Sequence, residues 1–141
     1  MAESKTLTKK EQRRLTISKL IAIATDEFAD KGYAAASTES IVQKAGLTRG
    51  ALYHHFKNKA GLFTAVFKYA QEEIGRRVEK EAEQSQDLWG QLILGCRGFL
   101  KASSDPKLQQ IVVVDGPAVM KWETVRQLDL SVDGSSFNLL K

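Results

Sequence analysis

Apolar residues recur at helical spacing along most of this chain. The first long helix is predicted from Lys9 to about Asp30, and its apolar positions, three or four residues apart, share one face: Ile17, Leu20, Ile21, Ala24 and Phe28. Gly32 is expected to end this helix as a C-terminal cap. No pattern typical of a strand is longer than the run "IVVV" at 111–114. The pattern therefore predicts an all-α fold.

The next segment predicts two short helices joined by three residues. Ser37 or Thr38 can cap a helix of about two turns, which ends before Gly46. In the link "GLT", Gly46 permits a left-handed turn and Thr48 can cap the following helix, "RGALYHHF". Two short helices with a glycine-containing turn of this length are typical of a helix-turn-helix.

The helix "RGALYHHF" has two unlike faces. Leu52 and Phe56 lie four residues apart and are expected to pack against the preceding helices. The outward arc of "RGALYHHF" and the residue after it are basic and aromatic: Arg49, Gly50, Tyr53, His54 and Lys57.

A long helix is predicted to follow "KNK" and to continue into the charged run "GRRVEKEAEQSQ", which is interpreted as a solvated face and junction.

Three later segments are also predicted to be helical. The stretch "DLWGQLILGCRGFLKASSD" predicts an apolar helix, Asp105 and Pro106 can begin another, and "AVMKWETVRQLD" is expected to be helical as well. Cys96 lies in the first of these segments and is interpreted as a small core residue. As the single cysteine of the chain, it excludes an internal disulfide framework.

Composition and charge narrow the functional class. The 141 residues, 43% of them hydrophobic, suit one ordinary domain. Residues 1–80 hold 15 Lys and Arg against 9 Asp and Glu, a net charge of +6, whereas residues 81–141 hold 6 against 8, a net charge of −2. This asymmetry favours a polyanion-binding unit joined to an apolar remainder, with a solvated basic surface as the simpler alternative. No apolar run is long enough to span a membrane and the N-terminus has no signal-peptide core, so a cytoplasmic location is expected.

The adjacent histidines His54 and His55 argue against a metal site or a catalytic pair. Consecutive residues of a helix point about 100° apart, so the two rings cannot chelate one metal from one face. The sequence also lacks the motifs of activated nucleophiles, of metal-dependent hydrolases and of phosphate-binding loops. We therefore expect no enzyme activity, no cofactor and no metal.

Insertion of the helix Arg49–Phe56 into the major groove of duplex DNA accounts for these features together. The planar fork of Arg49 matches the two acceptors of guanine, and Tyr53 and His54 can donate hydrogen bonds or contact a thymine methyl group. Lys57, Lys59 and Thr38 are expected to contact phosphates. Taken singly, the aromatic residues would be interpreted as amphipathic surface.

The segment from about Arg14 to Gln71 resembles the DNA-binding domain of the TetR family of bacterial transcriptional regulators. The resemblance rests on "F…GY" at the end of the first helix, "T.ESI", "AG.T.GALYHHF" and "K.K..LF". It implies a three-helix helix-turn-helix domain over residues 1–71, then a long connecting helix and a partial helical effector-binding and dimerisation domain over residues 72–141. The DNA contacts it implies are Thr38, Thr48, Arg49, Gly50, Tyr53, His54 and Lys59.

The same resemblance implies a homodimeric repressor that binds a palindromic operator and releases it when a small-molecule effector binds the C-terminal domain. Family members are usually several tens of residues longer, and the final two helices that form the dimer interface are not evident in this sequence. We therefore expect either a truncated chain or unusual dimerisation, and a weak dimer or a monomer in solution.

Two other functional classes stay open at this point. The first is a small-molecule-binding or sequestering module without its own operator, and the second is an inert fragment that pairs with a longer homologue. Salt-dependent binding to duplex DNA distinguishes the DNA-binding regulator from both. The candidate effector pocket consists of Phe67, Trp89, Cys96, Phe99, Met120 and Trp122, although aromatic residues at helical spacing are more often plain core.

Overall fold

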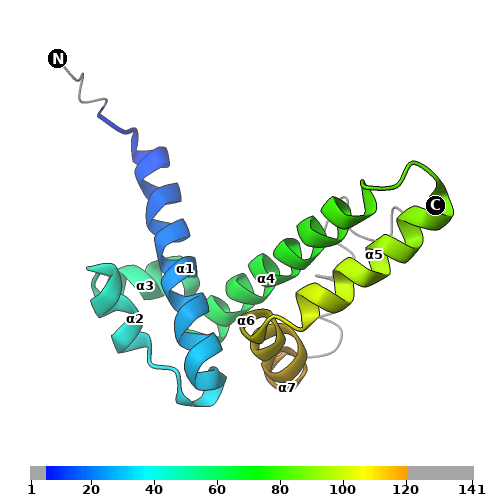
Figure 1. Cartoon of the computed structure of the whole chain (residues 1–141). Helices are drawn as coiled ribbons and strands as arrows, with labels where there is room; N and C mark the ends of the chain where they lie inside the picture. Colours follow the sequence, from blue (N-terminus) through cyan, green and yellow to red (C-terminus); the bar gives the residue numbers. More distant parts are fainter. Residues whose placement is uncertain (1–5, 121–141) are drawn as a thin grey trace.

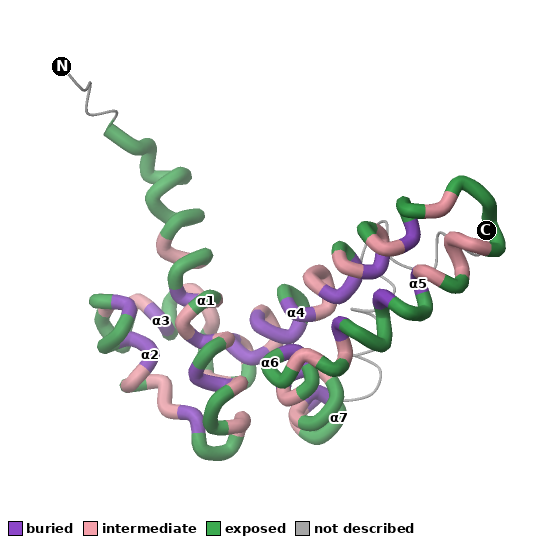
Figure 2. Tube along the Cα trace, in the orientation of Figure 1, coloured by how far each residue is buried: buried purple, intermediate pink, exposed green. Residues whose placement is uncertain are grey.

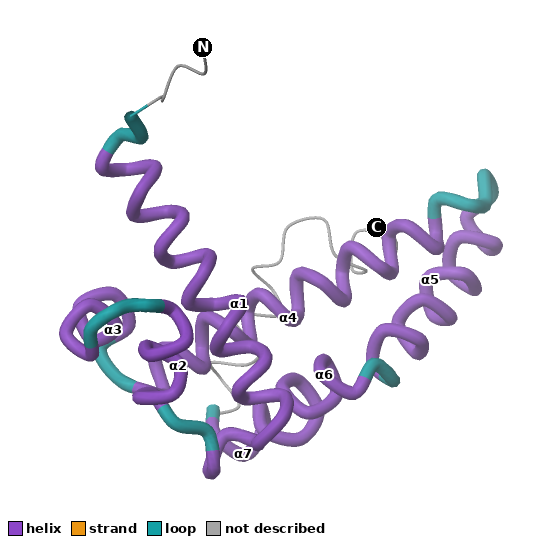
Figure 3. Tube along the Cα trace, turned by 60° about the vertical axis from the view of Figure 1, so that its left-hand side comes forward, coloured by secondary structure: helices purple, strands orange, loops and turns teal. Residues whose placement is uncertain are grey.

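The computed structural model describes residues 6–120. Over this range all the regular structure is helical, as Figure 3 shows, so the all-α prediction is confirmed for the described residues. The elements are α1 (Lys9–Ala35), α2 (Thr38–Ala45), α3 (Arg49–Phe56), α4 (Lys59–Ala82), α5 (Leu88–Ser103), α6 (Pro106–Leu108), the π-helix η1 (Gln109–Asp115) and α7 (Gly116–Val119).

The helices α1, α2 and α3 lie together at one end of the described chain (Figure 1). From there α4 leads outward, and α5 returns antiparallel along it. The short elements α6 and η1 then pack back against α1, η1 also contacts α4, and α7 packs on η1. The first turns of α1 project beyond the other helices and are exposed (Figure 2). The predicted boundary after Gln71 falls inside α4, which continues through it.

Side-chain caps fix where the helices begin. Ser37 caps α2 by accepting a hydrogen bond from the N–H of Ser40 at 3.3 Å. Thr48 caps α3, as predicted, through the N–H of Ala51 at 3.2 Å. Asp105, also as predicted, caps the helix that follows it. Each such cap contributes on the order of 1 kcal/mol to helix stability.

Two glycines adopt left-handed backbone conformations at helix ends. Gly46 (φ 67°, ψ 30°) ends α2 as predicted. Gly32 (φ 77°, ψ 163°) breaks the helical path of α1, but helical structure resumes as far as Ala35. The sequence prediction therefore places the break in α1 correctly at Gly32. It ends the helix three residues too early, because α1 extends to Ala35.

A core of large apolar side chains joins the first four helices. Phe28 and Phe63 meet edge to face with ring centroids 5.2 Å apart. Full burial of a side chain of this kind stabilises the fold by about 1.5–3 kcal/mol. The largest apolar side chains exposed by less than 2% in the first four helices are Leu20, Phe28, Ile41, Leu52, Leu62, Phe63, Val66, Phe67 and Val78.

The pairing of α4 with α5 differs from the sequence prediction in two ways. The charged run after Ile74 is not only a solvated junction, because Val78 and Ala82 within it are buried. On α5 the buried positions are small, Gly95, Gly98 and Ala102, and a Cβ at Gly98 would lie 3.0 Å from the Cβ of Glu81. Close packing through small residues leaves several larger apolar side chains of α5 exposed, among them Trp89, Ile93 and Phe99.

Cys96 is consequently exposed, and its interpretation as a core residue is wrong. The predicted helix "AVMKWETVRQLD" can be compared with the structure only over its first three residues. The helix α7 ends at Val119 and Met120 is extended, while residues 121–129 lie outside the described part of the chain.

Glu27 is the one charged residue that is buried among the described residues, with 2% of its surface exposed. Its carboxylate accepts hydrogen bonds from Lys31 Nζ (2.7 Å) and Lys44 Nζ (3.3 Å), and from the N–H of Ser37 (3.3 Å) and the hydroxyl of Ser40 (3.4 Å). Burial by itself raises the pKa of Glu27, but the hydrogen bonds from Lys31, Ser37 and Lys44 outweigh burial and lower the pKa to about 2. This carboxylate fastens α1 to the start of α2.

Glu27→Gln is expected to lower the free energy of unfolding at neutral pH by about 1–3 kcal/mol, because buried donors lose a charged acceptor. Folding lowers the pKa of Glu27 from 4.5 to about 2. The stability that the ionised carboxylate contributes is therefore complete above the unfolded-state pKa of 4.5, and it is lost as the pH falls from 4.5 to about 2. Urea unfolding as a function of pH measures the effect.

The matched control is Glu81→Gln, which removes a carboxylate from a single surface ion pair with Lys101 at 3.1 Å. As the pH falls from 4.5 to about 2, the wild-type chain should lose more stability than the Glu27→Gln variant. If the free energy of unfolding depended on pH in the same way for the wild-type chain and the Glu27→Gln variant, the role assigned to Glu27 would be contradicted.

Candidate nucleic-acid interface

The exposed face of α3 carries the residues predicted to contact DNA. Arg49, Gly50, Tyr53 and His54 are all exposed, whereas Leu52 on the opposite face is fully buried. The predicted division of this helix into an inward and an outward face is therefore confirmed for these residues. Lys57 is exposed just beyond the helix end, at the turn into α4.

Arg49, at the start of α3, contacts one residue of α2 and one of its own helix. Its Nη1 lies 3.5 Å from Oε1 of Glu39 on α2, and its guanidinium carbon lies 5.8 Å from the centre of the Tyr53 ring. The sequence offered no sign of the pair with Glu39, because it depends on how α2 and α3 cross. An exposed ion pair contributes roughly 0–1 kcal/mol, so Arg49 can exchange it for an acceptor on a ligand.

The two histidines occupy different environments. His54 is exposed, whereas His55 is half-buried, and their ring centroids lie 5.4 Å apart. Burial lowers the pKa of His55, and electrostatic interaction with His54 and Arg13 lowers it further. The buried Nδ1 of His55 has no hydrogen-bond partner among the described residues. No group of three or more His, Cys, Asp or Glu side chains in residues 6–120 is arranged to hold a metal ion.

The turn between α3 and α4 contains strained backbone at Lys57 (φ 66°, ψ −49°). The N–H of Asn58 donates to the carbonyl oxygen of Phe56 at 2.8 Å, which closes a γ-turn of the rare kind with positive φ at its centre. Asn58 then caps α4 through the N–H of Gly61 at 2.7 Å. A Cβ at Gly61 would collide with the carbonyl oxygen of Phe56, so the close approach of the two helices requires glycine here.

Lys59 and Thr38 begin α4 and α2, respectively. The Nζ of Lys59 lies 4.6 Å from the centre of the Tyr33 ring and donates to the carbonyl oxygen of Ala34 at 3.4 Å. Thr38 is half-buried beside the cap residue Ser37. The predicted contact residues are thus distributed over α2, α3 and the turn into α4.

The predicted effector pocket is not assembled in the described structure. Phe67 is a core residue with 1% exposure and Met120 is buried at 9%, whereas Trp89 and Phe99 are 70% and 50% exposed on α5. Cys96 is exposed on the same helix, and Trp122 lies outside the described residues. The described residues thus do not bring these side chains together, because α5 packs on α4 through its small residues, and their role in effector binding stays a prediction.

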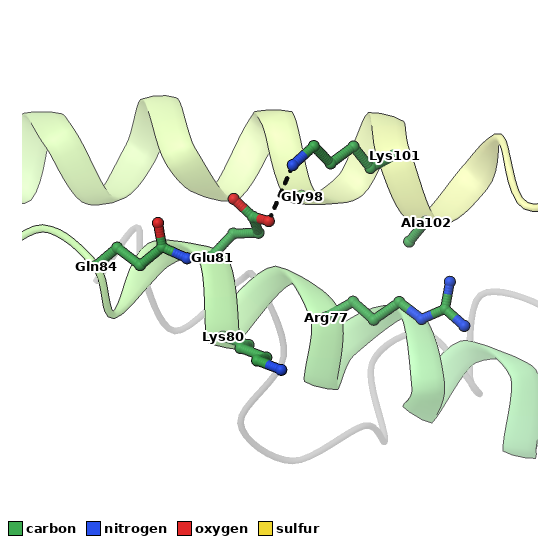
Figure 4. A pocket seen from close by; sticks show the side chains of 7 residues that line it. All are labelled: Arg77, Lys80, Glu81, Gln84, Gly98, Lys101 and Ala102. Carbon is green, nitrogen blue, oxygen red and sulfur yellow. Dashed lines mark hydrogen bonds and ion pairs between the residues drawn. The ribbon is translucent and has the colours of Figure 1, made fainter.

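A different cavity, of about 280 Å³, lies between α4 and α5 (Figure 4). It is mainly polar in its side chains, and Lys101 Nζ pairs with Glu81 Oε1 at 3.1 Å across it. Arg77 at its edge is engaged by Glu73 and Asp105, both at 3.0 Å. The lining residues are Arg77, Lys80, Glu81, Gln84, Gly98, Lys101 and Ala102.

Two stretches of the chain match known protein families. Residues 20–66 match the family described as bacterial regulatory proteins, tetR family, and residues 89–134 match the tetracyclin repressor-like C-terminal domain. The chain belongs to the TetR family. The helix-turn-helix formed by α2 and α3 lies within the first of these two stretches.

Relatives within the TetR family match mainly the N-terminal half. The Transposon Tn10 TetC protein of Escherichia coli is 45% identical over 58 residues, which are 41% of this chain and 29% of that protein. The HTH-type transcriptional regulator CymR of Pseudomonas putida is 39% identical over 70 residues, 50% of this chain and 34% of that protein. The chain thus matches only about a third of the length of these relatives.

Solved structures of TetR-family regulators extend the similarity to most of the chain. A TetR-family transcriptional regulator from Pectobacterium atrosepticum superimposes with a TM-score of 0.71 at 34% identity and covers 86% of this chain and 64% of that one. A regulator from Marinobacter aquaeolei has a TM-score of 0.74 at 21% identity, with 93% and 68% covered, and shows the fold alone. No helix described in this TetR-family chain has the length and hydrophobicity needed to cross a bilayer.

In this TetR-family chain Lys57→Gly is expected to raise the free energy of unfolding by about 1 kcal/mol, since glycine adopts positive φ without the steric cost of a Cβ. Lys57→Ala is the matched control, because it removes the same side chain and keeps the strained backbone. Thermal unfolding of the two variants measures the difference. Equal stability of the glycine and alanine variants would show that the turn carries no strain.

Proposed function

We propose that this chain is a sequence-specific DNA-binding transcriptional regulator that inserts α3 into the major groove of duplex DNA. The observation that supports this most directly is the exposed face of α3, where Arg49, Tyr53 and His54 stand on a helix anchored by the buried Leu52. A major groove is wide enough for one helix, and the first residues of such a helix reach base edges.

Base contacts and backbone contacts are proposed to come from different residues. Arg49 can leave Glu39 and direct its guanidinium fork at the N7 and O6 acceptors of a guanine. Tyr53 and His54 lie on the same exposed face and are proposed to contact neighbouring bases. Lys57, Lys59 and Thr38, with the capping residue Thr48, are proposed to hold phosphates on either side and so set the position of α3.

Gly50 has open space around it, since the nearest atom to a Cβ placed there is Thr48 Oγ1 at 3.9 Å. Nothing inside the protein therefore excludes a side chain at this position. We propose that Gly50 instead allows the DNA backbone to approach the start of α3 closely.

Repression, relief by a small-molecule effector and binding of a homodimer to a palindromic operator in the cytoplasm are proposed from family membership. A homodimer places two α3 helices on successive turns of one face of the duplex, which explains why a palindromic operator is expected. An effector must bind the form with the wrong α3 spacing more tightly than the DNA-bound form, or it cannot release the operator.

Arg49→Ala and Lys59→Ala should impair DNA binding in different ways. Arg49→Ala is expected to cost about 1–3 kcal/mol on duplexes selected from random DNA, to relax discrimination at one base pair and to change binding to mixed-sequence duplex much less. Lys59→Ala should weaken all sequences alike and lower the slope of log affinity against log salt by about one.

Competition of each variant against single-base variants of a selected duplex measures the difference. Identical specificity profiles for the two variants would refute base recognition by α3. A wild-type affinity that does not change with salt would favour the alternative of a sequestering or heterodimerising module without its own operator.

A further inference from the structure

A carboxylate of the π-helix η1 reaches the end of α1. Oδ2 of Asp115 accepts a hydrogen bond from the backbone N–H of Tyr33 at 3.0 Å and from Nε2 of Gln110 at 3.1 Å. The preceding residue, Gly32, is the break in α1, and a Cβ placed there would lie 3.5 Å from Gln110 Nε2. Asp115 therefore holds the backbone at the point where α1 departs from helical geometry.

The ring of Tyr33 carries this constraint to Lys59. It stacks on Phe28 with centroids 5.8 Å apart and meets Phe63 edge to face at 5.1 Å, which fixes its orientation. Its other contact is the ammonium group of Lys59, 4.6 Å from the ring centre. Lys59 also donates to the carbonyl oxygen of Ala34, the residue after Tyr33. Both contacts of Lys59 thus come from Tyr33, which donates the hydrogen bond to Asp115, and from the next residue, Ala34.

The π-helix is itself firmly placed. Ile111 within it is fully buried, and Gly116, which follows it, is so close to the ring of Phe67 on α4 that a Cβ there would collide. Short π-helices are rare and often mark functional sites. A displacement of η1 would therefore move Asp115 relative to α1.

We propose that Asp115 is a positioning residue for Lys59, and that through Tyr33 it couples the placement of η1 to the strength of phosphate binding. The proposal rests on the proposed function, in which Lys59 contacts DNA. Coupling of this kind is reciprocal, so DNA that engages Lys59 also favours the docked position of η1. The route passes from η1 through the end of α1 to Lys59, the first residue of α4.

The test measures binding of the full chain to a mixed-sequence duplex by fluorescence anisotropy over a range of salt concentrations. Asp115→Ala is expected to weaken binding about two- to fivefold, the range of one cation–aromatic contact at a partly exposed site. It should also lower the salt slope toward that of Lys59→Ala. Asp115→Asn keeps an oxygen that accepts the Tyr33 N–H and should bind as the wild type does.

The control is Lys107→Ala, which removes a different polar contact between this region and α1, the exposed ion pair of Lys107 Nζ with Asp26 Oδ1 at 2.6 Å. This variant leaves Tyr33 untouched and should keep the wild-type salt slope. Thermal unfolding of every variant establishes that each is folded at the binding temperature.

The double variant Asp115→Ala with Lys59→Ala decides the mechanism. If Asp115 acts through Lys59, the double variant binds no more weakly than Lys59→Ala alone. Additive losses, or an unchanged salt slope in Asp115→Ala, would overturn the inference and leave the proposed function standing. If the wild-type chain binds no duplex at any salt concentration, the proposed function fails and this inference fails with it.

Discussion

The buried carboxylate of Glu27 is the interaction on which the arrangement of the first three helices depends. It lies between α1 and α2 and accepts hydrogen bonds from two lysines, a backbone N–H and a serine hydroxyl. A buried charge is tolerated only when it is satisfied in this way, and removing one partner from such a group is costly. Because α2 leads through the tight Gly46 turn to α3, the orientation of the exposed face of α3 follows from the position of Glu27.

A second constraint sets the other end of α3. The strained turn at Lys57, the cap at Asn58 and the close approach at Gly61 fix the angle between α3 and α4. The face of α3 is thus held at both ends by local geometry, while its outward side chains are exposed to solvent. Sites on rigid elements hold their contacts more accurately than sites on loops, as recognition of base edges requires.

Local signals in the sequence predicted the positions of the helices well. Thr48, Gly46 and Asp105 act at the predicted places because capping and left-handed turns depend on residues only a few positions away. The outward face of α3 was predictable for the same reason, since its spacing separates Leu52 from Arg49 and Tyr53.

The contacts that depend on distant segments were not predictable. The burial of Glu27 has no local signature, because its donors come from α2 and its capping residue as well as from α1 itself. Cys96 was placed in the core because apolar spacing cannot show that α5 packs through Gly98 and Ala102 instead. The link from Asp115 to Tyr33 joins residues 82 positions apart and has no signature in sequence.

The measurement that tests the central claim most directly is a titration of the labelled chain with duplex DNA selected from a random pool, followed residue by residue through its amide NMR signals. If α3 enters the major groove, the largest shifts occur from Thr48 to His54 and at the turn carrying Lys57 and Lys59, with little change along the exposed face of α5. Shifts that are absent from α3, or that are concentrated on α5, would contradict this account of how the chain binds DNA.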